Sequence, residues 1–201
     1  FIKSPGILFL HGCVSLGYDK SNGSSGPAGW YSKQTKQLFE PTPLLYPVEK
    51  KDYNSNEYIK GQWDALSQEL KEAKRVTVFG YSAPKTDIEA IGLLQSAWGS
   101  ANERAMEQFE LIDIREEDEV KKSWETFIHS HHYNYSKNYF DCSLALHPRR
   151  TIESYNHWVA PFTLDEAFQE GTRIPKNFKT LDELWEWHKP LIEAEEKFYK
   201  E

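Results

Sequence analysis

The sequence predicts an α/β protein built on a parallel sheet, and two observations carry this prediction. Short runs of aliphatic and aromatic residues alternate with longer segments in which apolar residues recur every three or four positions. The connections between them are short, as in the βαβ units that build parallel sheets. The alternation covers residues 1–130 and then fades, so we expect a second, aromatic-rich and mainly helical region over residues 131–201.

The first predicted strand, residues 7–10, is a continuous apolar run that ends in His11-Gly12. Such a run is typical of a parallel strand covered on both faces, which requires neighbours on each side. We therefore expect the sheet to be incomplete at its amino-terminal side within these 201 residues. Residues 18–27, rich in Gly, Ser and Asn, predict a mobile surface loop. Residues 41–47 predict a proline-punctuated connector with a short strand.

A strand and two helices are predicted in the middle of the chain. Residues 56–74 have apolar residues at helical spacing and predict an amphipathic helix that leads into a strand beginning at Arg75. That strand ends at Gly80. The next helix is expected to begin with a capping box at Thr86 and to end at Gly99.

The remaining elements are predicted from similar patterns. Residues 109–114 predict another strand, and the acidic residues 116–119 suit the positive end of the helix that follows it. Residues 133–146 favour one or two strands. A second capping box at Thr180 opens a carboxyl-terminal helix, which Pro190 is expected to kink or split.

Composition excludes several classes of function. The net charge of −7, with no concentrated basic surface, argues against direct nucleic-acid binding. The cysteines, Cys13 and Cys142, form no CxxC pair for zinc, and they predict free thiols in a reducing, cytoplasmic setting. The cluster of His129, His131 and His132 lacks ligands at fitting spacing, so no metal site is expected. No apolar run approaches the ~20 residues that cross a bilayer.

His11 is the candidate general base, because histidine can take a proton near neutral pH. Gly12 beside it leaves room for a substrate. The alternative reading of His11 is a structural histidine whose hydrogen bonds are satisfied within the protein.

Polar residues also follow the two predicted strands that begin at Arg75 and Phe109. Open α/β sheets bind ligands at the carboxyl ends of their strands, which is where these polar residues stand. In the stretch after Gly80, Ser82 and Asp87 could hydrogen-bond sugar hydroxyls or phosphates. Asp87 could equally serve as a charge at a helix N-terminus. Asp113, at the end of the next strand, stands where an acidic residue commonly accepts from a ribose hydroxyl.

Residues 7–115 resemble the carboxyl-terminal half of a bacterial Sir2-like domain. The resemblance is carried by Leu10-His11-Gly12, a proline-rich stretch leading to Lys50-Lys51, Trp63 in a helix, and above all G-Y-S-x-P-x-x-D over residues 80–87. Such domains have a Rossmann-like fold, bind NAD and either deacylate proteins or hydrolyse NAD, and many bacterial ones act in anti-phage defence.

The resemblance implies a role for each candidate residue. His11 would be the catalytic base, Gly80 with Ser82 would contact the nicotinamide-side ribose and phosphates, and Asp113 would hold the adenosine ribose. The implied partner is NAD or an ADP-ribose-type nucleotide. The implied cofactor-binding residues are Gly12, Gly80, Tyr81, Ser82, Asp87 and Asp113.

Several features of the family are missing from this sequence, and their absence changes the activity that we predict. The glycine-rich pyrophosphate loop, the catalytic Asn and Asp region and the zinc-binding cysteines are absent from these 201 residues. The absent cysteines argue against a deacylase and favour an NAD glycohydrolase as the parent enzyme. We expect the 201-residue chain alone not to hydrolyse NAD.

Two other interpretations stay open. The chain could be a non-catalytic nucleotide-sensing or assembly module. A homo-oligomer is a further possible form of the protein. It could also be an α/β-hydrolase, since residues 9–12 resemble an oxyanion strand and Gly80-Tyr81-Ser82 resembles the start of a G-x-S-x-G elbow. Pro84 stands where the last glycine of that elbow belongs.

Overall fold

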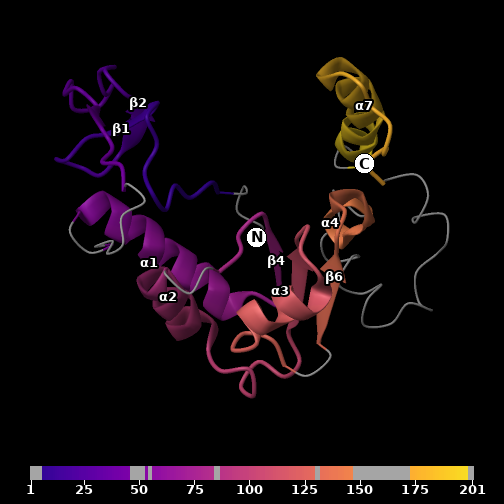
Figure 1. Ribbon diagram of the computed structural model, residues 1–201. Helices are drawn as coiled ribbons and strands as arrows, with labels where there is room; N and C mark the ends of the chain where they lie inside the picture. The colour runs from indigo at the N-terminus through magenta and orange to yellow at the C-terminus, as the bar shows by residue number, and fades with distance from the viewer. Residues whose placement is uncertain are drawn as a thin grey trace. The chain divides into compact units, whose positions relative to one another are not determined.

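The computed structural model describes residues 6–45, 53, 56–83, 87–129, 132–146 and 173–198 (Figure 1). The chain divides into two compact units. The first comprises residues 1–76, 82–107 and 122–132, and the second comprises residues 77–81, 108–121 and 133–201. The division into residues 1–130 and 131–201 stays a prediction.

A three-stranded parallel sheet confirms the α/β class. Its strands are β4 (Arg75–Phe79), β5 (Gln108–Ile112) and β6 (Tyr133–Ser136), in the order β4-β5-β6. Phe109 of β5 lies opposite Tyr133 of β6 in a parallel register. All residues of β5 are buried, as expected of a strand covered on both faces. Because β6 lies beyond residue 130, the sheet continues into the predicted extension.

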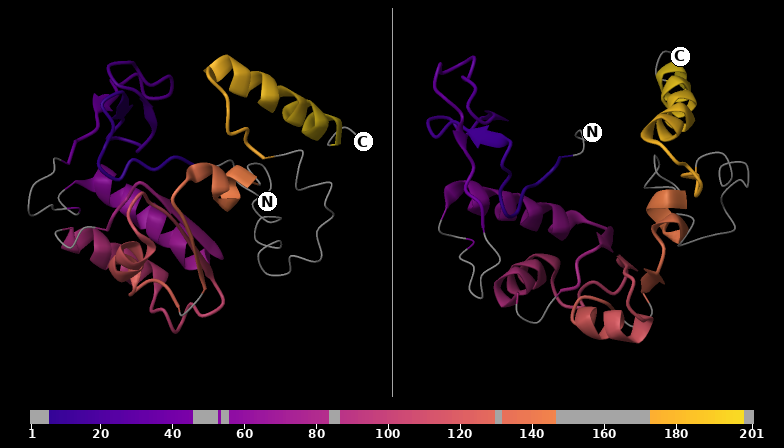
Figure 2. Two further views of the ribbon diagram at one scale, coloured as in Figure 1. Left: turned by 45° about the vertical axis from the view of Figure 1, so that its right-hand side comes forward. Right: turned by 45° about the horizontal axis from the view of Figure 1, so that its top comes forward.

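The helices α1 (Glu57–Glu72) and α2 (Ile88–Trp98) pack side by side in the first unit (Figure 2). Helix α1 begins at Asn56, whose side-chain oxygen accepts two of the otherwise unpaired N–H groups of the first turn. Apolar side chains of both helices then form one core, around Ile59 and Trp63 of α1 and Ala90 of α2. The predicted amphipathic helix is confirmed.

Helix α2 begins one residue later than predicted. Its N-cap is Asp87, which makes no side-chain capping bond, and Thr86 lies outside the described residues. The predicted end is confirmed, because Gly99 adopts a φ of 91°, a conformation that favours glycine. Helix α3 (Glu117–Trp124) has the expected acidic first turn.

The predicted strand over residues 7–10 is wrong, because these residues form no strand pairing. Two side chains of α1 satisfy their backbone instead. The Phe9 N–H donates to Oε1 of Gln62 at 2.9 Å, and Nε1 of Trp63 donates to the Leu10 carbonyl at 3.1 Å. Apolar composition was consistent with a strand, but it could not show that a helix would supply the hydrogen-bond partners.

The predicted loop over residues 18–27 is wrong at its two ends, which form the strands of a β-hairpin, whereas residues 19–24 form the loop between them. Strands β1 (Leu16–Tyr18) and β2 (Ser25–Pro27) pair antiparallel, and β3 (Glu40–Pro41) pairs with the other edge of β1. The Asp19 and Asn22 side chains accept the N–H groups of Ser21 and Ser24, each at 2.9 Å. The polar residues thus specify a turn, in which Gly23 has a φ of 71°.

The carboxyl-terminal part is helical beyond β6, where only one of the two possible strands forms among the described residues. The short helices η1 (Tyr139–Asp141) and α4 (Ser143–Leu146) follow, and Cys142 and Ala145 pack on Ile112. Helix α7 (Leu181–Phe198) passes through Pro190 without a break, so the predicted split is wrong. Its predicted capping box is partly confirmed: the Glu183 N–H donates to Oγ1 of Thr180, but the Glu183 carboxylate accepts from Lys179 instead of Thr180.

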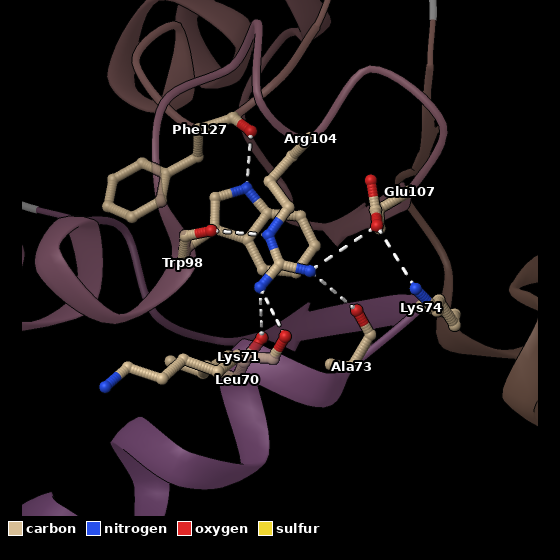
Figure 3. Close-up of polar contacts among 8 residues, drawn as sticks. All are labelled: Leu70, Lys71, Ala73, Lys74, Trp98, Arg104, Glu107 and Phe127. Carbon is tan, nitrogen blue, oxygen red and sulfur yellow. Dashed lines mark hydrogen bonds and ion pairs between the residues drawn. The ribbon is translucent and has the colours of Figure 1, made fainter.

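Arg104 closes the carboxyl end of α1 (Figure 3). Its guanidinium donates to the carbonyls of Leu70, Lys71 and Ala73 at 3.1, 2.6 and 3.4 Å. Its Nε donates to the Trp98 carbonyl at 2.6 Å. Since the last carbonyls of a helix have no partner within the helix, this one side chain satisfies groups that would otherwise need water or a cap.

Arg104 also holds the residues around it. The guanidinium lies 4.6 Å from the ring centre of Trp98, whose Nε1 donates to the Phe127 carbonyl at 3.0 Å. Glu107 pairs with both Arg104 and Lys74, at 3.5 and 3.4 Å. The fork of donors and the flat contact on an indole are properties that lysine does not share.

We expect Arg104→Met to lower the free energy of unfolding by about 3 kcal/mol, because several partly buried carbonyls lose their donor. Arg104→Lys should recover less than half of this loss, since an ammonium lacks the fork. Urea unfolding followed by tryptophan fluorescence measures both. Lys122→Met, at an exposed position, is the control. Equal effects of Arg104→Met and Lys122→Met would contradict the assigned role.

The β1–β2–β3 sheet should be sensitive to acid through Asp19, which is 1% exposed. Hydrogen bonds from Ser21, and then from Thr35, lower the pKa of the Asp19 carboxyl. A lowered folded-state pKa contributes stability above the unfolded value of about 3.9, and this contribution is lost as pH falls below it. NMR signals of residues 16–41 should therefore broaden or shift between pH 4 and 2, roughly. An Asp19→Asn variant that retained the same acid transition would contradict this origin.

Candidate functional site

The predicted site residues are divided between the two units. His11, Gly12, Ser82 and Asp87 belong to the first, whereas Gly80, Tyr81 and Asp113 belong to the second. Their convergence on one nucleotide pocket stays a prediction. The two groups are therefore described separately.

The loop that carries His11 is fixed by the segment of residues 42–45. The His11 carbonyl accepts the Leu45 N–H at 3.0 Å, and the hydroxyl of Thr42 bonds both the N–H and the carbonyl of Cys13. Gly12 has a φ of 85°, and a Cβ there would lie 1.9 Å from the Pro43 carbonyl oxygen. The backbone of this loop consequently accepts no other residue at position 12 without moving.

The His11 side chain belongs to a hydrogen-bonded chain of three residues. Nε2 of His11 lies 3.3 Å from the hydroxyl of Tyr53, and that hydroxyl donates to Oδ1 of Asp87 at 3.2 Å. The imidazole is exposed, whereas Tyr53 is 2% exposed. An imidazole that can reach solvent is thus connected through a buried phenol to a carboxylate at the start of α2.

Tyr53 is held by the core of the helix pair. Its ring makes an edge contact with Trp63, with ring centres 4.7 Å apart, and stacks on His11 at 5.9 Å. It also lines a pocket of about 100 Å³ between α1 and α2, with Leu66 and Leu93 among the other walls. Packing therefore fixes the phenol that joins His11 to Asp87.

In the second unit, Gly80 and Asp113 lie at the carboxyl ends of neighbouring strands. The Gly80 N–H donates to the Ile112 carbonyl at 3.5 Å, which links the turn after β4 to the end of β5. Gly80 has a φ of 72°, and a Cβ there would meet no atom of the described residues within 4 Å. As far as the described residues go, the space beside this backbone is open, so another molecule can approach it closely.

Asp113 is engaged by Arg115. The guanidinium donates to both carboxylate oxygens at 2.7–3.1 Å, and the Arg115 N–H adds a bond of 2.9 Å. The hydrogen bonds from Arg115 lower the pKa of the Asp113 carboxyl. The Tyr135 hydroxyl donates to the Arg115 carbonyl and holds this turn on β6. A ribose hydroxyl would have to share the carboxylate with Arg115.

The other candidate residues contribute less. Ser82 is exposed, the next residue, Ala83, is buried at a φ of 45°, and Pro84 lies outside the described residues. Cys13 and Cys142 are free thiols, as predicted. Hydrogen bonding from Ser15 lowers the pKa of the Cys13 thiol.

The histidine cluster shows no ligand set in the described part of the chain. His129 and His132 lie with ring centres 5.8 Å apart, and His131 is outside the described residues. No group of three or more His, Cys, Asp or Glu side chains is arranged there to hold a metal ion.

Two of the important residues were missed from the sequence. Tyr53 stands in a polar stretch without periodicity, and only its packing reveals its role. Arg115 follows Asp113 by two residues, so the pair could have been anticipated from opposite charges just after a strand.

No family model, curated protein or solved structure matches this chain. Among the described helices, none combines the length and apolar character that a membrane crossing requires.

Gly12 gives a direct test of the loop geometry. We expect Gly12→Ala to destabilise the protein by about 2 kcal/mol more than Gly23→Ala, because both have positive φ but only Gly12 adds a collision with backbone. Thermal or urea unfolding of the two variants measures the difference. Equal destabilisation would show that the Pro43 carbonyl does not constrain the His11 loop.

Proposed function

We propose that this chain is part of a Sir2-like, Rossmann-like NAD-binding protein whose complete form is an NAD glycohydrolase in antiviral defence. The observation that carries the proposal is the chain from His11 through Tyr53 to Asp87, because an oriented and exposed imidazole is what a general base requires. The sequence resemblance supplies the substrate class.

The reaction assigns His11 one proton transfer. As the bond between nicotinamide and ribose breaks, its electron pair leaves with the nicotinamide nitrogen. His11 takes the proton from a ribose hydroxyl or from the water that adds to the ribose carbon. The products are nicotinamide and ADP-ribose, and the proton passes to solvent when His11 returns to its neutral form.

The Gly80 turn supports a role in contacting the phosphates or the nicotinamide-side ribose. Its positive φ and the open space beside it permit close approach of a ligand to the backbone. The hydrolase alternative has less support, because α2 begins only at Ile88 and so does not follow Ser82 directly, as a nucleophile elbow requires.

Titration of ADP-ribose and NAD into the 201-residue chain, followed by thermal shift and calorimetry, tests the proposal. We expect saturable binding that Gly80→Asn weakens by at least about tenfold, since asparagine tolerates positive φ but places a side chain in the open space. Gly29→Asn is the matched control, because Gly29 has a φ of 79° and similar open space. No binding of either nucleotide would overturn the proposal.

Turnover separates the enzyme from the sensing module. In a protein that carries the whole domain, we expect His11→Ala to reduce nicotinamide release by about 100-fold or more, the usual contribution of a general base. Nucleotide binding should persist in this variant. Tight binding without any nicotinamide release by the unaltered protein would favour the sensor.

A further inference from the structure

We propose that Tyr53 is a positioning residue that holds His11 in the tautomer with the proton on Nε2, so that Nδ1 is the basic nitrogen. The inference deepens the proposed function, on which its catalytic meaning rests. Its structural content concerns only the described residues of the first unit.

Counting protons fixes the direction of the hydrogen bonds. A carboxylate only accepts, so the contact between Tyr53 and Asp87 uses the single proton of the phenol. The phenol oxygen then has only lone pairs to offer His11 at 3.3 Å. The proton in that contact must come from Nε2, and a neutral imidazole with a proton on Nε2 has its lone pair on Nδ1.

The arrangement is fixed from both sides. The phenol cannot turn away easily, because Tyr53 is 2% exposed and packs edge-on against Trp63. Asp87 is the N-cap of α2 without a capping bond from its side chain, so the positive end of the helix favours its charge. The His11 main chain is anchored to Leu45. None of these hydrogen bonds depends on a bound nucleotide.

The same hydrogen bonds through Tyr53 to Asp87 also stabilise the protonated state of His11. When Nδ1 takes a proton, both ring nitrogens become donors, and Nε2 keeps its acceptor on Tyr53. The positive charge of the imidazolium then faces a phenol that is polarised by the Asp87 carboxylate. The distances of 3.2 and 3.3 Å are long, as catalytic hydrogen bonds often are before a ligand binds.

NMR of the protein with ¹⁵N-labelled histidine, without nucleotide and above the pH range in which histidine titrates, tests the assignment. We expect the His11 ring to show only the form with the proton on Nε2. In Tyr53→Phe that proton should exchange with water about tenfold faster, the equivalent of one lost hydrogen bond. Tyr58→Phe, which removes a hydroxyl from the same core, should leave it unchanged.

Two results would overturn the proposal: a proton on Nδ1 in the unaltered protein, or an Nε2 proton whose exchange ignores Tyr53→Phe. Should Tyr53→Phe fail to fold, Asp87→Ala serves instead, since its loss removes no helix-capping bond. The freed phenol proton can then turn toward His11, which makes Nε2 an acceptor, so the population with the ring proton on Nδ1 should rise. Because no nucleotide is present, these outcomes are independent of whether the chain binds NAD.

Discussion

The capping of α1 by Arg104 is the constraint from which the geometry of the first unit follows. The carbonyls at the end of that helix have no partners of their own, and one guanidinium satisfies those of Leu70, Lys71 and Ala73. Ala73 is the C-cap of α1 and stands two residues before β4. Glu107, which immediately precedes β5, pairs with the same guanidinium, so one side chain contacts the residues that lead into both strands.

The helices α1 and α2 position the residues of the candidate site around His11. Helix α1 supplies Trp63, which both holds the Leu10 carbonyl and packs against Tyr53. Asp87, the N-cap of helix α2, is the acceptor at the far end of the hydrogen-bonded series. The His11 ring contacts Tyr53, which lies outside the helices but is held by Trp63 of α1 and by Asp87, the N-cap of α2. Sites supported in this way keep their geometry better than sites built on loops alone.

Apart from the local β1–β2 hairpin, whose composition predicts a loop, the sequence predicted the elements whose pattern is local and missed those whose partners are distant. The helices and strands from Asn56 to Trp124 follow from apolar spacing and from caps within a few residues. The strand over residues 7–10 failed because its hydrogen-bond partners, Gln62 and Trp63, are more than 50 residues away. For the same reason His11 and Asp87 could be nominated, whereas Tyr53, which joins them across 42 and 34 residues, could not.

Asp113, predicted to bind the ribose, and His11, predicted to be the general base, are prepared to different degrees. Asp113 already accepts three hydrogen bonds from the Arg115 guanidinium and one from its N–H, so its charge is compensated before any ligand arrives. A neutral hydroxyl gains little by competing with such a charge-assisted pair. The hydrogen bonds that Tyr53 makes with His11 and Asp87 are longer than those between Arg115 and Asp113, and the His11 imidazole is exposed. Of the two, His11 is thus the group whose reactivity a bound ligand can change more readily.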